Sequence, residues 1–444
     1  MAHAPNTLAS PADIAAAVAA AVERQPVIDM HTHLYPPSFG TTLAGRTGKS
    51  DLNGMLLWGV DELLTYHYLV AEVYRVVTPD KLPYEQFWRM TKRQQADHIW
   101  KNLFVERAPI SEACRGVLTT IQKLGLDPSD PTPDGWRKWF DQQDPSEYID
   151  RVMQVANVKS ITMTNAVFDD NERQRWLDNP NVGADPRFTA VLRIDPLLRN
   201  WPEAAKKLTQ WGRRAEENLS ATSISSAKIF LNDWINKQKA IYLAVSLPPE
   251  WRYPADPNDP IARAGQTVLE QVILPVCADH NIPFAMMIGS HLRVNPALRE
   301  AGDMVGKADV QSVVNLCREF PQNRFFVTFL ARENQHEVAV AARKFGNLML
   351  FGCWWFVNNP SLIEEITRMR VELLGTSFIP QHSDARVLDQ LIYKWDHSRK
   401  IIAKVLTDKF QDVAATGRAP TKESIDGTVR LMLAENFERF RTAK

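Results

Sequence analysis

Two histidines stand two residues apart at the end of an apolar stretch, in the sequence VIDMHTHL at residues 27–34. Side chains two positions apart on a β-strand point to the same face, so a strand here would direct His31 and His33 together. Imidazole nitrogens paired in this way are typical ligands of zinc and other divalent transition metals. The alternative is two unrelated polar residues at a strand edge, because an HxH pair alone is a weak signal.

A second polar group lies near the carboxyl terminus, in the sequence QHSDAR at residues 381–386. The same period of two places His382, Asp384 and Arg386 on one face of a strand. If the first and last strands are neighbours, Asp384 completes a ligand set of two nitrogens and one oxygen with His31 and His33. A structural ion pair between Asp384 and Arg386 is the alternative, and both can hold, since a metal-bound carboxylate often has a cationic partner.

The elements that must position these residues are short apolar runs separated by helical patterns. We count eight such runs, at residues 26–33, 159–165, 188–195, 240–247, 282–289, 324–330, 348–356 and 373–385. Strands that alternate with helices predict βαβ units and a parallel sheet, and eight of them predict an α/β fold of the (β/α)8 TIM-barrel type. No glycine-rich nucleotide-binding sequence follows the first run, which removes the usual reason to prefer an open sheet. Both polar groups fall at the carboxyl ends of barrel strands, where the active sites of such barrels lie.

The spacing between the first two runs is far longer than one helix needs. We interpret residues about 50–150 as a helical insertion after the first strand, placed as a cap over the barrel mouth. The chain contains neither an internal repeat nor a low-complexity linker. We therefore expect residues 1–444 to form a single barrel domain that carries this cap.

Composition and charge narrow the classes of partner. Lys plus Arg and Asp plus Glu are both 52, which gives a formal net charge of zero and no overall attraction to nucleic acid or to an anionic membrane. A small polar substrate fits this balance better. The chain contains no run of 18 apolar residues, and the stretch at residues 11–26 lacks the basic start of a signal peptide and favours a helix. The cysteines show no CxxC spacing, so we expect them to be reduced and mostly buried in a cytoplasmic protein; they are Cys114, Cys277, Cys317 and Cys353.

Seven stretches give the sequence a resemblance that covers nearly the whole chain. They are DMHTHL, LLWGVDELLTYHYL, MTNAVFDDNER, LRIDPLL, FLARENQHE, GCWWFVNNP and QHSDARV, in this order. With them the chain resembles the uronate isomerase (glucuronate isomerase) family of the amidohydrolase superfamily. One departure concerns the fifth strand, where this chain has Met287 and many members have histidine. A binuclear hydrolase site is therefore poorly supported, and the role of the fifth strand stays open.

The resemblance implies a reaction, a cofactor and a set of site residues. It implies interconversion of D-glucuronate with D-fructuronate and of D-galacturonate with D-tagaturonate, in a homo-oligomer that takes a small uronic acid. It implies one divalent metal ion, zinc before manganese or iron, on His31, His33 and Asp384. The catalytic residues carried over are Asp384, Tyr68, His67 and Arg386, and the substrate contacts are Arg193, Trp354, Trp355, Arg386 and His67.

These residue types suit an aldose–ketose isomerisation, which moves a proton between C2 and C1 through an enediol. His67 or Tyr68 could exchange the proton, and the guanidinium of Arg193 could hold a carboxylate through two hydrogen bonds. Each of these residues also has an alternative interpretation. His67 is then a histidine of the core, Arg193 and Asp195 form a structural pair, and the two tryptophans are buried in the core. A direct hydride shift is the alternative mechanism. A mononuclear hydrolase or decarboxylase and a metal-free binding protein are the alternative functions.

Overall fold

A parallel sheet forms the centre of the protein, in a computed structural model that describes residues 7–8, 10–43, 54–179 and 185–443. Its strands follow the order β1-β2-β3-β4-β5-β8-β9, and every neighbouring pair is parallel. Their bounds are β1 Val27–Thr32, β2 Val158–Ala166, β3 Phe188–Arg193, β4 Leu243–Leu247, β5 Phe284–Ile288, β8 Phe325–Phe329 and β9 Leu348–Leu350. The first six predicted strands are confirmed, and the seventh is shorter than predicted because its last residues leave the sheet as a loop.

The eighth predicted strand is not a regular strand. Ile379 forms an isolated parallel bridge with Phe351, and beyond it the backbone amide of Asp384 donates to the carbonyl of His31 at 3.1 Å. The amide of His33 in turn donates to the carbonyl of Ala385 at 2.8 Å. Residues 379–385 therefore fill the gap between β9 and β1 and close a TIM-type barrel, although their backbone is irregular.

A buried carboxylate strengthens this closure. Asp29, in the middle of β1, accepts hydrogen bonds from the amide of Ser383 at 3.1 Å and from the indole of Trp395 at 2.8 Å. Asp29 is fully buried, so its charge is compensated by these donors rather than by water. The hydrogen bonds fix the register between the first strand and the closing segment, on which the predicted ligands lie.

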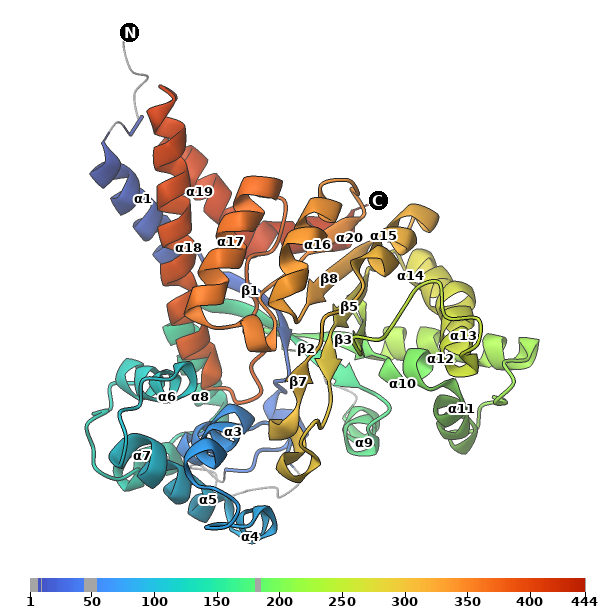
Figure 1. The fold of residues 1–444 in the computed structure, drawn as a ribbon, viewed down its shortest axis with the longest axis horizontal. Helices are drawn as coiled ribbons and strands as arrows, with labels where there is room; N and C mark the ends of the chain where they lie inside the picture. Colours follow the sequence, from blue (N-terminus) through green and yellow to red (C-terminus); the bar gives the residue numbers. More distant parts are fainter. Residues whose placement is uncertain (1–6, 9, 44–53, 180–184, 444) are drawn as a thin grey trace.

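Helices surround the sheet, and Figure 1 shows them outside the central strands. Their bounds are α1 Pro11–Arg24, α9 Asp170–Asp178, α10 Asp195–Arg199, α11 Trp201–Gln210, α12 Ala221–Gln238, α13 Pro260–Val268, α14 Leu274–Asp279, α15 Val310–Glu319, α16 Gln335–Ala342, α17 Pro360–Leu374, α18 Gln390–Ala415, α19 Lys422–Arg430 and α20 Asn436–Thr442. The helix predicted at residues 11–26 is confirmed as α1, which begins at the N-cap Ser10. No helix among the described residues is long and apolar enough to span a membrane.

The long stretch between β1 and β2 is helical, as predicted. It contains α2 Val60–Leu64, α3 His67–Val76, α4 Tyr84–Arg89, α5 Lys92–Trp100, α6 Glu112–Lys123, α7 Asp134–Asp141 and α8 Pro145–Ala156, and Figure 1 shows α3 to α7 together beside one end of the barrel. The first residues of the predicted insertion, 50–53, lie outside the described residues. The chain bends at Tyr66, between α2 and α3, so that His67 is the first residue of α3.

A short hairpin from the end of β5 reaches the same end of the barrel. β6 (Ser290–His291) pairs antiparallel with β7 (Met304–Val305), and the turn between them carries a short helical segment, η5 (Pro296–Gly302). The indole of Trp88 on α4 donates to the carbonyl of Ala297 at 2.9 Å, and the guanidinium of Arg299 lies 4.5 Å from the centre of the Trp88 ring. The hairpin is thereby attached to the helical insertion.

The opposite end of the barrel is closed by the carboxyl-terminal helix. Phe437 and Phe440 of α20 pack on Phe326 of β8, with ring centres 5.7 and 5.0 Å apart. These aromatic rings close the end of the barrel at which the strands begin, and the open end lies at the carboxyl termini of the strands.

All four cysteines are free and buried, as predicted.

Candidate active site

The two histidines of β1 and the aspartate of the closing segment meet at the carboxyl end of the barrel. The Nε2 atoms of His31 and His33 lie 3.2 and 3.3 Å from Oδ1 of Asp384. The Nδ1 atom of His33 lies 3.1 Å from the hydroxyl of Thr164 on β2, which fixes the orientation of this ring. The structure therefore brings together the three ligands that the resemblance implied.

The donor set fits a divalent metal ion. Two ligands ~2.1 Å from one tetrahedral ion are ~3.3–3.4 Å apart, which is close to both nitrogen–oxygen distances here. In addition, Nε2 of His31 and Oδ1 of Asp384 are buried and have no hydrogen-bond partner among the described residues. A bound cation would satisfy both atoms, since buried polar groups otherwise have partners.

His382 is a further candidate ligand that our sequence analysis placed on the correct face but left out of the ligand set. The ligand atoms of His31, His382 and Asp384 all lie within 4.8 Å of one another, and His33 is not part of this mutually close group. Neither ring nitrogen of His382 has a hydrogen-bond partner among the described residues. The H-x-D spacing in QHSDAR was the sequence signal for this residue.

Local backbone geometry makes room for this cluster. Asp384 has a φ of +53°, in the left-handed region that is uncommon outside glycine. Gly352, with a φ of +62°, faces His382, and a Cβ at this position would lie 1.7 Å from Nδ1 of His382. Residues 382–386 therefore converge through an irregular backbone, and the period-two alternation by which we predicted their common face does not apply.

The environment of the cluster shifts the pKa values of His33 and Asp384 so that both side chains are in the protonation states that bind a cation. Burial, assisted by the charge of Arg386, lowers the pKa of His33 to about 3, so the imidazole is neutral at pH 7. Burial by itself would raise the pKa of Asp384, but the close contacts of its carboxylate with His31 and His33 outweigh burial and hold that pKa well below its usual value. A neutral imidazole and an ionised carboxylate, as at His33 and Asp384, are the protonation states that bind a metal.

A cavity lies next to His31, His33 and Asp384. Its central space measures about 80 Å³, several times the ~10–15 Å³ that one water molecule needs. Its wall includes the predicted site residues His31, His33, His67, Arg193, Trp354, Trp355, Asp384 and Arg386. The structure thus gathers eight of the nine predicted site residues around one small polar space. Met287 of β5 also lines it.

Tyr68 is the predicted site residue that does not form part of the cavity wall as described. Its ring packs against His67, with ring centres 4.7 Å apart, and its buried hydroxyl has no hydrogen-bond partner among the described residues. Nζ of Lys394, also buried, lies 5.6 Å from the centre of the Tyr68 ring. Burial raises the pKa of Tyr68 well above its usual value, so the phenol is protonated, and it lies behind His67.

His67 faces the cavity from the insertion. Its ring lies 5.7 Å from that of Trp355, edge to face, and both belong to the cavity wall. Burial, followed by the charge of Arg386, lowers the pKa of His67 well below its usual value. A neutral imidazole therefore lies beside the aromatic side of the cavity.

The arginines of the cavity already have partners in part. Arg193 at the end of β3 donates to Asp195 at 2.7 and 3.1 Å and to the hydroxyl of Ser246 at 3.0 Å. The structural pair that we considered as an alternative for Arg193 is present, and Arg193 lines the cavity as well. Arg386 donates to Glu300 of η5 at 2.8 Å. Arg199, Ser246, Ser290 and Asp303 also line the cavity and were not identified from the sequence.

Arg386 and His67 also line a larger outer hollow of about 590 Å³. The insertion contributes Glu62, Tyr66, Trp88 and Lys92 to this hollow, and the hairpin contributes Arg299 and Glu300. We call this hollow the vestibule. The ion pair between Arg386 and Glu300 lies where the vestibule meets the inner cavity.

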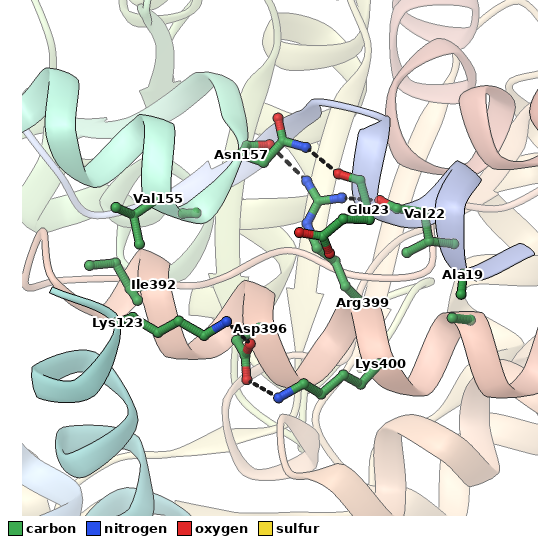
Figure 2. Close-up of a pocket in the computed structure, with 12 residues that line it drawn as sticks. Ala19, Val22, Glu23, Lys123, Val155, Asn157, Ile392, Asp396, Arg399 and Lys400 are labelled. Carbon is green, nitrogen blue, oxygen red and sulfur yellow. Dashed lines mark hydrogen bonds and ion pairs between the residues drawn. The ribbon is translucent and has the colours of Figure 1, made fainter. Parts of the chain in front are cut away.

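A separate cavity of about 210 Å³ lies beside the amino ends of β1 and β2, away from this cluster. Figure 2 shows the guanidinium of Arg399 donating to the backbone carbonyls of Val22 and, at 2.7 Å, of Asn157. Arg399 also donates to the carbonyl of Gln25 at 2.9 Å. In the same view Asp396 pairs with Lys123 and Lys400. These contacts tie α1, α8 and α18 together, and we assign this cavity to packing rather than chemistry.

The fold and the site are those of a (β/α)8-barrel enzyme whose candidate active site lies at the carboxyl ends of the strands and contains a His-His-Asp group that could hold a metal. No protein-family model matches the chain, and no curated protein matches it in sequence. Among solved structures, it is similar to a uronate isomerase from Bacillus halodurans C-125, with 50% identity, a TM-score of 0.90, and 99% of this chain and 98% of the other covered. The chain belongs to the uronate isomerase family.

More distant solved structures share the fold. A glucuronate isomerase from Caulobacter crescentus is 15% identical with a TM-score of 0.72, covering 100% of this chain and 98% of the other. A uronate isomerase from Thermotoga maritima is 13% identical with a TM-score of 0.71, covering 96% of this chain and 97% of the other. At this identity the likeness concerns the architecture, which these chains share over nearly their full lengths.

Proposed function

We propose that this isomerase interconverts D-glucuronate with D-fructuronate and D-galacturonate with D-tagaturonate, by proton transfer between C2 and C1. The observation that carries the proposal is the cavity itself. A group able to hold a metal lies on the side of β1 and the closing segment, with Arg386 beside it, and Arg193 and Arg199 lie on the side of β3. A six-carbon chain with an aldehyde at one end and a carboxylate at the other fits this polarity.

One divalent ion, which we propose to be zinc, would be held by His31, His33 and Asp384. When bound, it would polarise the carbonyl and hydroxyl oxygens at C1 and C2 and favour the enediol. Trp354 and Trp355 offer an aromatic wall to the carbon chain. Arg193 donates to Asp195 through Nε and Nη2, which leaves its Nη1 group for the other end of the substrate.

The proton must leave C2 and return to C1, while the hydroxyl proton of C2 moves to the carbonyl oxygen of C1. Asp384 is an ionised carboxylate of the cavity wall, and we assign it the removal of the proton from C2 and its return to C1. His67 is neutral and lines the cavity, so it can both accept and donate a hydrogen bond at the substrate oxygens. Tyr68 lies behind His67, and we assign it the support of that imidazole as a protonated phenol. Arg386 supplies positive charge beside the developing enediolate.

Isomerisation in D₂O tests the proposal. A captured proton that exchanges with solvent is replaced by deuterium, so D-fructuronate formed from D-glucuronate should carry deuterium at C1, visible by NMR. Tyr68→Phe should lower kcat much more than it changes KM. Full retention of the original C2 hydrogen at C1, with Tyr68→Phe near the wild-type rate, would favour a hydride shift. Absence of any ketose from either uronate would refute the function itself.

A further inference from the structure

Helix α10, which directly follows β3, carries two charged residues four positions apart. Asp195, its first residue, accepts two hydrogen bonds from Arg193, at 2.7 and 3.1 Å, and one from the amide of Ser246 at 3.1 Å. The charge of Arg193 is therefore balanced by a carboxylate that the same segment supplies. Arg199, the last residue of α10, reaches the wall of the inner cavity.

Arg199 differs from the other arginines of the cavity in having no counter-ion. Arg386 is paired with Glu300 at 2.8 Å, and Arg193 is paired with Asp195. In the part of the chain that the structure describes, the Arg199 guanidinium makes neither an ion pair nor a hydrogen bond. Among the described residues, Arg199 is thus the arginine of the cavity wall whose charge no ion pair balances.

The position of Arg199 around the barrel places its charge away from the candidate metal ligands. The candidate metal ligands lie on β1 and on the closing segment, which are neighbours in the ring. β3 and β4, between which α10 lies, are two and three strands further around. A substrate whose C1 and C2 lie at the metal ligands extends its C6 end across the mouth, toward Arg199 and the hydroxyl of Ser246.

We infer that Arg199 is a specificity-determining residue, which selects substrates that carry a carboxylate at C6 over substrates with an uncharged group there. The inference rests on the proposed function and identifies which cation performs the selection. Arg193 positions hydrogen-bond donors, whereas Arg199 provides net charge. A guanidinium that lacks a counter-ion in the free enzyme gains one when the carboxylate binds, so the interaction is not offset by breaking an existing pair.

A pair of ligands that differ only in charge tests this role. D-glucuronate and D-glucuronamide have almost the same size at C6, but the amide is neutral. For the metal-loaded wild type we expect a clear preference for the acid, measured as the ratio of kcat/KM values, or of dissociation constants where the amide is not turned over. Because Arg199 is an exposed residue at the rim, Arg199→Met should reduce this ratio by about 5–20-fold. The loss should appear mainly in KM for the acid, with the amide nearly unaffected.

Two further variants complete the experiment. Arg199→Lys keeps the charge and should retain most of the ratio. Arg418→Met removes an exposed arginine from the turn between α18 and α19 and should leave the ratio unchanged. If Arg199→Met keeps the wild-type ratio while the wild type isomerises uronates, the inference is wrong and the proposed function stands. If the wild type forms no ketose, the proposed function fails, and the dissociation constants of the two ligands still decide the role of Arg199.

Discussion

Arg386, a predicted site residue, is engaged in an ion pair with Glu300. Glu300 belongs to η5, and its side chain is 64% exposed, against 37% for Arg386. Exposed pairs of this kind contribute ~0.2–1 kcal/mol. If the substrate uses Arg386 only after this pair opens, that free energy opposes binding. Glu300→Gln should then increase apparent affinity.

The size of the effect follows from the populations of the two states. A pair worth ~0.2–1 kcal/mol leaves Arg386 unpaired in about 15–40% of molecules, and apparent affinity falls in proportion to that fraction. Removing the pair should therefore lower KM for D-glucuronate about 2–6-fold, with kcat nearly constant. In the wild type, added NaCl should produce part of the same decrease by screening the pair, and in Glu300→Gln this component should be absent.

Steady-state kinetics at two salt concentrations is the assay, with Asp426→Asn as the control. Asp426 forms a surface pair with Arg24 at 2.7 Å, on helices remote from the cavity, so its removal should leave KM unchanged. A fall in kcat for Glu300→Gln without a fall in KM would refute the reasoning. It would show that Glu300 holds Arg386 in its productive position instead of withholding it.

Three further predictions concern the metal group, Arg193 and a buried carboxylate. Purified protein should contain about one divalent ion per chain by elemental analysis, and His33→Ala should lower that content; full content in His33→Ala but not in His382→Ala would place the ion on His31, His382 and Asp384. Arg193→Met should lower kcat/KM for D-glucuronate about 10–150-fold, the equivalent of ~1.5–3 kcal/mol for a charged hydrogen bond, and an unchanged value would limit Arg193 to pairing with Asp195. Burial raises the pKa of Asp389 from 3.8 to about 6, so the folded state holds this proton more tightly than the unfolded state. Its contribution to stability is complete below about pH 4 and is lost as pH rises through about 6; Asp389→Asn should flatten the pH dependence of Tm between about pH 4 and 6, and an unaltered slope would contradict this assignment.

The barrel and the pair of histidines on its first strand could be predicted from the sequence because local patterns specify them. Strands such as 284–288 are apolar throughout and buried on both faces, and this pattern is typical of parallel sheets. His31 and His33 could be paired because β1 is regular and its period of two places both side chains on one face. The same argument correctly predicted that His382, Asp384 and Arg386 come together, but its premise of a regular strand does not hold. Asp384 has a left-handed backbone, which the period of a strand does not describe.

The residues that were missed owe their position to tertiary structure. Arg199 lies on a five-residue helix, and its role depends on which other arginines are paired, which requires the distances from Arg193 to Asp195 and from Arg386 to Glu300. Glu300 reaches the site through a hairpin whose attachment to Trp88 has no signature in the sequence. Tyr68 and His67 are adjacent in sequence, yet only His67 lines the cavity, because both lie on α3 and successive side chains of an α-helix point about 100° apart.

The joining of the first strand to the closing segment has a consequence for synthesis of the protein on the ribosome. Asp29 and Ser383, which are hydrogen-bonded, are 354 residues apart, so β1 is made first and obtains its second neighbour almost last. Until residue 383 has emerged, one edge of β1 carries unpaired backbone groups, and His31 and His33 have no Asp384 to face. A growing chain therefore holds neither a closed barrel nor a complete metal group, and a prematurely terminated chain that ends before this segment leaves an open strand edge available to other chains.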